Sequence, residues 1–218
     1  MNGHKIFPSP FIKYLGIYLD INRNGKFHCD LLMPKLKRAN GMLCKARHYI
    51  PIEELKTLYY AIFSSHLVYG CQVWGQNKDI YTDKVFKLQN RAMRIISFSD
   101  FHASSSPIYK VMKILKLEDF ITLQNCLFVH DFLNKKLPVC FNSYFQSANK
   151  LHSIGTKSSQ LGCIFIPHVS TKRYGLNSIS RKSLSCWNHF SKLFKCNLSI
   201  LPRFVLKNKL TSHFLNSY

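Results

Sequence analysis

The sequence predicts a mainly α-helical protein that opens with a β-hairpin and ends in a small α+β part. Apolar residues recur every three or four positions over residues 30–50, 52–70 and 83–96, which is the spacing of one helix face. Residues 11–20 instead alternate and are rich in β-favouring side chains. In the last third of the chain, short β-like runs separate further helical segments.

The N-terminal hairpin is expected over residues 11–20, FIKYLGIYLD, with a turn at 22–25. The flank before it is short and contains prolines, so the sequence supplies few local partners for this strand. Since an unpaired hairpin is marginally stable in water, we expect this one to be weakly protected.

The helix expected over residues 30–50 has a narrow apolar face, on which leucine and alanine step by four and three positions. Asp30 is suited to cap its start. Pro51 ends it, because the residue before a proline avoids the helical conformation. The opposite side of this helix is cationic and carries Lys37, Arg38, Lys45 and His48.

The segment 52–70 is apolar on most of its circumference, which is typical of a buried helix. Trp74 follows near its end, beside a glycine, where an exposed indole would be able to stack on a base or a sugar. We expect the centre of the core to include Leu58, Ile62, Phe63 and Leu67.

Residues 83–96 predict a helix with one apolar face and one cationic face. Like charges at steps of three and four residues destabilise an isolated helix by a few tenths of a kcal/mol per pair. Such a face is either an ordinary solvated surface or a surface that lies alongside phosphates. The cationic side of the helix expected over residues 30–50 favours the second interpretation. The cations are Lys84, Lys87, Arg91 and Arg94.

The rest of the chain predicts four more helices and two β-like runs. The helices are expected over 107–115, 118–135, 180–194 and 202–216, and the β-like runs over 163–167 and 170–175. We expect three regions, namely the hairpin over 1–28, a helical domain over 29–137 and a basic C-terminal region over 138–218.

The charge balance favours a polyanionic partner. The chain has 31 Lys and Arg residues against 10 Asp and Glu, a net charge of +21, and no acidic residue follows Asp131. A long stretch without carboxylates cannot neutralise its own charge, so nucleic acid is the natural partner. An acidic protein partner is the alternative.

The cysteines and the hydropathy favour an intracellular protein, nuclear or cytoplasmic and not secreted. The eight cysteines have no framework spacing, which indicates free thiols in a reducing compartment. The start of the chain lacks the apolar segment of a signal peptide, and no apolar run reaches the ~20 residues that cross a bilayer.

No catalytic, metal-binding or cofactor-binding residues are predicted. Two-metal catalysis needs clustered carboxylates, and the two adjacent acidic pairs, at 53–54 and 118–119, lie where helices begin and complement the helix dipole. Cys186 and His189 have a zinc-like spacing, with Cys196 or His213 as further candidates. A structural zinc site usually shows two tight ligand pairs, and this sequence has one.

Several blocks, taken in order, resemble the C-terminal part of reverse transcriptases of non-LTR (LINE-type), jockey-like retrotransposons. They are KYLGIYLD (13–20), KLKRANGMLCKARHYIP (35–51), LYYAIFSSHLVYGCQVWG (58–75) and LQNRAMRII (88–96). KILKLEDFITLQNCLFVHDFLN (113–134) and SLSCWN (183–188) fit the same region. The resemblance extends over nearly the whole chain.

This resemblance implies a palm-end strand, a helical thumb that holds the template–primer duplex by its backbone, and a connector. The family's active site lies upstream, in an aromatic-x-Asp-Asp motif that this sequence lacks. We therefore expect a thumb-like, non-catalytic fragment that binds RNA and DNA. An enzyme with a new kind of site and a helical protein-interaction module with an acidic partner are the alternatives.

Overall fold

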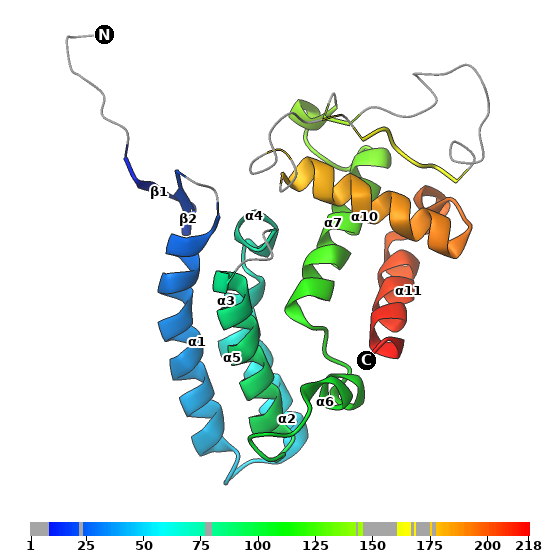
Figure 1. Cartoon of the computed structure of the whole chain (residues 1–218). Coiled ribbons are helices and arrows are strands. Elements are labelled where there is room, and N and C mark those ends of the chain that lie inside the picture. The colour runs from blue at the N-terminus through cyan, green and yellow to red at the C-terminus, as the bar shows by residue number, and fades with distance from the viewer. Residues whose placement is uncertain are drawn as a thin grey trace, which may run out of the picture. The chain divides into compact units, whose positions relative to one another are not determined.

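The computed structural model describes residues 9–21, 24–76, 80–142, 144–145, 161–166, 168, 175 and 178–218. The chain forms two compact units, unit 1 over Met1–Ala103 and unit 2 over Ser104–Tyr218. Helices dominate both units and a two-stranded hairpin opens the described chain, so the predicted fold class is confirmed (Figure 1). The division expected after residue 137 falls inside unit 2, because the helix before it packs with the C-terminal helices.

The hairpin consists of β1 (Phe11–Tyr14) and β2 (Ile17–Asp20), paired antiparallel. Its turn is at residues 15–16, where both φ angles are positive, as in the type I′ turn that is common in two-residue hairpins. The single strand expected over 11–20 is therefore two short strands. The Phe11 ring stacks on Phe27 with centroids 3.8 Å apart, which joins the hairpin to the first helix.

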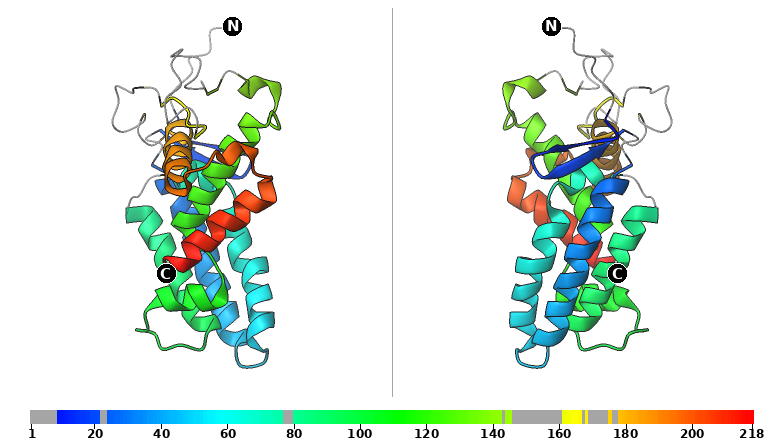
Figure 2. Two further views of the ribbon diagram at one scale, coloured as in Figure 1. Left: turned by 90° about the vertical axis from the view of Figure 1, so that its right-hand side faces the viewer. Right: turned by 90° about the vertical axis from the view of Figure 1, so that its left-hand side faces the viewer.

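Unit 1 continues as a bundle of three helical segments. The first is α1 (Lys26–Ala46), and the last is α5 (Ile80–Ile96). Between them, α2 (Ile52–Tyr59), a π-helical turn (Tyr60–Ser64) and α3 (Ser65–Val68) follow one another directly, and the short α4 (Cys71–Trp74) comes next. The two side views show α1, the α2–α3 segment and α5 adjacent to one another (Figure 2).

The core of unit 1 lies on the middle segment, as predicted for two of the four expected residues. Phe63 and Leu67 are buried, with 0% and 2% of their surface exposed. Leu58 and Ile62 are only half-buried, and Tyr60 is 47% exposed. The segment is therefore not buried on all sides, because α1 and α5 contact one part of its circumference.

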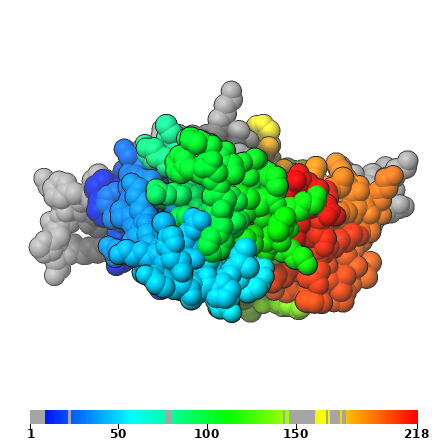
Figure 3. All heavy atoms as spheres, turned by 90° about the horizontal axis from the view of Figure 1, so that it is seen from below, coloured from blue at the N-terminus to red at the C-terminus, as the bar shows by residue number. Residues whose placement is uncertain are grey.

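The turn between α1 and α2 lies at the surface in the view from below (Figure 3). The preceding helix ends at Ala46, four residues before the predicted end at residue 50, so Pro51 does not end α1 and instead directly precedes α2. Tyr49, in this turn, is 86% exposed, while the neighbouring Arg47 guanidinium lies 4.7 Å from the centre of the Phe98 ring.

Unit 2 is built from α6 (Ser105–Met112), α7 (Leu117–Leu133), α10 (Ile179–Phe194) and α11 (Arg203–Asn216), close to the four predicted helices. Short 3₁₀ turns occur over Val139–Phe141 and Leu198–Ile200. In Figure 1, α10 crosses α7 above α11. Side chains of α7, α10 and α11 share one apolar core.

The predicted β-like runs of the C-terminal region form no regular strand among their described residues. At 163–166 there is a single β-bridge, at Ile164, and the Asn188 side chain accepts from the Ile164 N–H at 2.9 Å and donates to the Ile164 carbonyl at 2.7 Å. The run at 170–175 lies outside the described residues except for Gly175.

Candidate nucleic-acid interface

The cationic helices α1 and α5 lie side by side and run in the same direction. Three contacts join the two helices or the residues just after them. Their partners occur in the same order along both helices, as expected for parallel helices. The contacts are Lys26 with Tyr81, Asn40 with Leu88, and Arg47 with Phe98. In the second of these, the amide nitrogen of Asn40 donates to the backbone carbonyl at 3.0 Å.

Helical spacing places one predicted cation of α1 at this junction. Lys37 is eleven residues after Lys26 and three before Asn40, and residues at these separations share one side of a helix. Lys26 and Lys37 are both exposed, whereas Asn40 is buried between the helices. The α5-facing edge of α1 therefore carries two ammonium groups that are open to solvent.

The same reasoning places two cations of α5 at the junction. Lys84 is three residues after Tyr81, and Arg91 is three residues after Leu88, so both lie on the α1-facing side. Both are exposed. We call Lys26, Lys37, Lys84 and Arg91 the α1–α5 basic seam.

Two ammonium groups of the seam converge on one aromatic ring. The Nζ atoms of Lys26 and Lys84 lie 5.6 Å and 5.8 Å from the centre of the Tyr81 ring. Each such cation–π contact stabilises by about 0.5–1 kcal/mol at an exposed site, while the two like charges repel. Asp30, exposed one turn after Lys26, is the acidic residue on this edge of α1, so the seam remains net positive.

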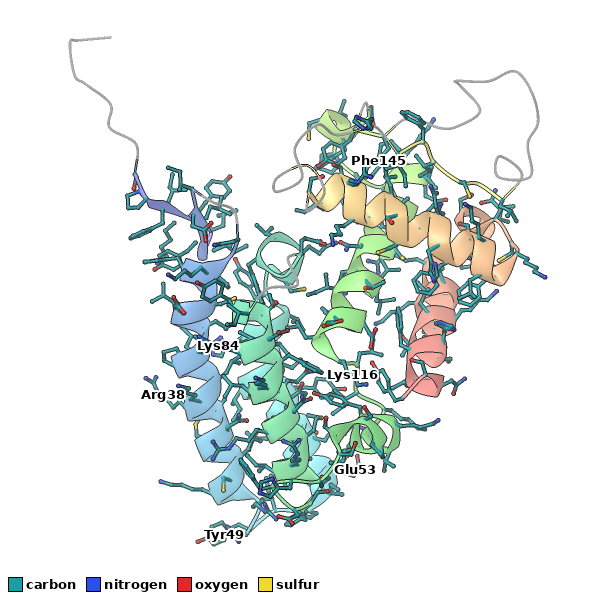
Figure 4. The ribbon with its side chains drawn as sticks, viewed as in Figure 1. Arg38, Tyr49, Glu53, Lys84, Lys116 and Phe145 are labelled. Carbon is teal, nitrogen blue, oxygen red and sulfur yellow. The ribbon has the colours of Figure 1, made fainter. Side chains whose placement is uncertain are left out.

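The other predicted cations face away from the seam or lie beside it. Arg38 projects from α1 on the side away from α5 (Figure 4). Lys45 lies seven residues later on that same side, and Lys87 lies farther round α5 than Lys84. His48 lies in the turn after α1, and all four are exposed.

Two further predicted binding residues make contacts within unit 1. The Nε of Arg94 donates to the Ala103 carbonyl at 2.8 Å and so holds the loop that follows α5. Trp74 is 2% exposed, and its indole N–H donates to the Tyr69 carbonyl at 3.0 Å. A base cannot stack on this ring, because α4 turns it inward against His28, with ring centres 5.4 Å apart.

The acidic pairs lie where they were expected. Glu53 and Glu54 occupy the first turn of α2, and Glu118 and Asp119 the first turn of α7, where carboxylates complement the helix dipole. Among the described residues, no group of three or more His, Cys, Asp or Glu side chains is placed to hold a metal ion.

The zinc-like pair of α10 lies in two different environments. Cys186 is in contact with α7, where burial raises the pKa of its thiol, and the Asn125 side chain hydrogen-bonds to it. His189 is exposed, and its ring is nearly perpendicular to that of Phe190, with ring centroids 5.1 Å apart.

Lys26 and Tyr81 were missed because α1 and α5 were predicted to begin at residues 30 and 83, four and three residues later than they do. α1 begins directly after Gly25, whose φ of 71° favours glycine and whose Cα lies too close to the Trp74 carbonyl for a side chain. The Asn24 side chain accepts from the Lys26 N–H at 3.0 Å. This Asn-Gly pair was the available signal for an earlier start.

In the described part of the chain, no helix is long and apolar enough to cross a membrane.

Comparison with known proteins connects the chain to a polymerase. The chain is 24% identical over 126 residues to the probable RNA-directed DNA polymerase from transposon X-element of Drosophila melanogaster. The match covers 56% of the chain and 14% of that protein's length. No protein-family model and no solved structure gives a significant match. The chain is thus distantly related to a transposon reverse transcriptase, of which it spans a small part.

Proposed function

We propose that unit 1 holds a template–primer duplex of RNA and DNA by its sugar–phosphate backbone, through the α1–α5 basic seam. The observation that carries this proposal is the convergence of four cations from two parallel helices, two of them at one tyrosine ring. Gathering like charges costs free energy in the unbound chain, and a line of phosphates offsets that cost.

The spacing of the seam suits a backbone rather than a base edge. Lys84 and Arg91 are seven residues apart, about 10 Å along α5, and Lys26 and Lys37 are about 16 Å apart along α1. Phosphates of one strand recur every 3.4 Å along a duplex axis, so each helix spans several of them. Ammonium and guanidinium groups that contact phosphates carry no base code, and binding is expected to be indifferent to sequence.

We further propose that the bundle of unit 1 corresponds to the thumb of a jockey-like reverse transcriptase, and that the hairpin corresponds to the end of its palm. The order of a hairpin followed by three helical segments and the distant relation to a transposon polymerase support this assignment. The chain itself would bind but not polymerise, since it lacks the aromatic-x-Asp-Asp motif of that family.

Competition between two polyanions tests the proposal against the acidic-partner alternative. The full chain is bound to a fluorescein-labelled RNA/DNA duplex, and anisotropy is followed as unlabelled duplex of another sequence or polyglutamate is added. We expect the second duplex to displace the first at matched concentration and polyglutamate at equal charge to displace it far less. Equal displacement by polyglutamate would contradict nucleic-acid recognition.

A further inference from the structure

Unit 2 carries more of the positive charge than unit 1. Over residues 104–218 the sequence has sixteen Lys and Arg residues against three acidic residues, a net charge of +13. Two of the acids have partners within the unit. Asp131 lies 3.1 Å from the Arg203 guanidinium, and Asp119 accepts from the Tyr218 hydroxyl at 2.6 Å. The unit therefore has many more basic residues than carboxylates.

Part of this charge is arranged as a line along α10. Lys182, Ser185, His189 and Lys192 follow at steps of three, four and three residues, which places them on one side of the helix. The last three are exposed and Lys182 is half-buried. We call these four residues the outer face of α10.

The opposite side of α10 is fixed in the core. Leu184, Trp187 and Phe190 are buried with side chains of α7 and α11, and the Trp187 indole donates to the Gly162 carbonyl at 3.0 Å. This packing holds the outer face in one orientation.

The chemistry of the outer face favours nucleic acid over an anionic membrane or an acidic protein. A helix that binds an anionic membrane inserts its apolar face, and the apolar face of α10 is already buried. A protein interface is built around buried aromatic or aliphatic anchors, whereas the outer face offers ammonium, imidazole and hydroxyl groups, with Leu193, 46% exposed, as the apolar side chain beside them. Such donors are the ones that contact phosphate oxygens in nucleic-acid complexes.

We propose that the outer face of α10 is a second binding surface for a nucleic-acid sugar–phosphate backbone, separate from the seam of unit 1. Lys182 and Lys192 lie ten residues apart, about 15 Å along the helix. That length matches several consecutive phosphates of one strand, with His189 and Ser185 as donors between the two ammonium groups. This proposal depends only on the structure within unit 2.

The test compares two pairs of lysines in the same unit. In the full chain, Lys182→Ala/Lys192→Ala removes two charges from the outer face, and Lys110→Ala/Lys113→Ala removes two exposed charges from the end of α6. Binding to a labelled mixed-sequence DNA duplex is measured over a salt series. We expect the α10 pair to lower the slope of log K against log salt by about 1.8, at 0.9 per phosphate contact, and the α6 pair to leave it unchanged.

An equal decrease for both pairs would mean diffuse attraction by the unit, and no decrease for the α10 pair would remove it from the interface. Either result overturns the proposal. Lys182→Gln/Lys192→Gln keeps much of the aliphatic stems and must reproduce the loss of slope, and circular dichroism confirms that each variant is folded. A seam variant, Lys37→Ala/Arg91→Ala, measured in parallel separates the two proposals, since each pair lowers the slope independently of the other.

Discussion

Phe63 is the residue on which the core of unit 1 depends most directly. Its ring is 0% exposed and stacks on Tyr59 with centroids 5.3 Å apart. Phe63→Ala should lower the free energy of unfolding by ~3–5 kcal/mol, because it removes buried surface and leaves a cavity. Denaturant melts measure this, with Tyr60→Ala, at a half-exposed position, as the matched control. A loss below about 1 kcal/mol at Phe63 would show that this segment is not the core.

Gly41 is a weak point of α1 that no packing requirement explains. It lies inside the helix with no positive φ, and nothing lies within 4 Å of the position where a Cβ would be. Gly41→Ala should raise the free energy of unfolding by about 0.5–1 kcal/mol, because alanine loses less backbone entropy in a helix. Thermal or urea melts give the sign, and a destabilised variant would mean that a neighbour fills this space.

His28 links the hairpin to α1 and makes this link pH-dependent. Its Nδ1 accepts from the Tyr18 N–H at 3.4 Å, and burial, with Lys35 nearby, holds its pKa below the ordinary value of 6.5. A group with a lowered folded-state pKa contributes stability that is present above pH 6.5 and is lost as the pH falls through the folded value.

We therefore expect exchange of the Tyr18 amide, corrected for intrinsic rate, to accelerate as the pH is lowered from neutral to acid. His28→Gln should flatten this dependence. An unchanged protection factor in the native chain across that range would show that the histidine does not report on the hairpin.

At the scale of elements, the hairpin is the least supported part of unit 1. All four residues of β1 are exposed, and the described sheet has two strands. Two-stranded sheets are marginal in water, so the amides of β1 and β2 should exchange much faster than those in the middle of α1. Hydrogen exchange measured residue by residue decides this, and equal protection of Tyr14 and Leu36 would contradict it.

The helices could be predicted from the sequence because their apolar periodicity is long and regular. α7 and α10 each begin and end within two residues of their expected limits. The hairpin turn and the start of α1 were misplaced, because a glycine with positive φ decides each of them and outweighs the pattern around it.

The candidate site could be predicted only in part. Periodicity shows that Lys37, Lys84 and Arg91 lie opposite an apolar face. Periodicity does not show which neighbour that face packs against. The convergence of Lys26 and Lys84 at Tyr81 therefore could not be predicted from the sequence. The prediction of an exposed indole at Trp74 was wrong for the same reason, because the fold around α4 sets the direction of this side chain.

At the scale of the whole molecule, the chain should bind nucleic acid without extending it. The sequence contains no aromatic-x-Asp-Asp motif, and polymerases need clustered carboxylates to hold two metal ions. Primer extension with Mg²⁺ or Mn²⁺ on a primed RNA template should give no incorporation above a no-protein control. Polymerase activity that co-purifies with the chain and is lost when an acidic residue of the chain is replaced would contradict this prediction.

The α1–α5 basic seam is tested most directly by the salt dependence of duplex binding. Lys37→Ala/Arg91→Ala removes two seam charges, and Arg38→Ala/Lys45→Ala removes two exposed charges from the side of α1 away from α5. On each of two unrelated B-form duplexes, the seam pair should lower the slope of log K against log salt by about 1.8, and the control pair by much less. An unchanged slope for the seam pair, an equal decrease for both pairs, or a loss on one sequence only would contradict backbone binding at the seam.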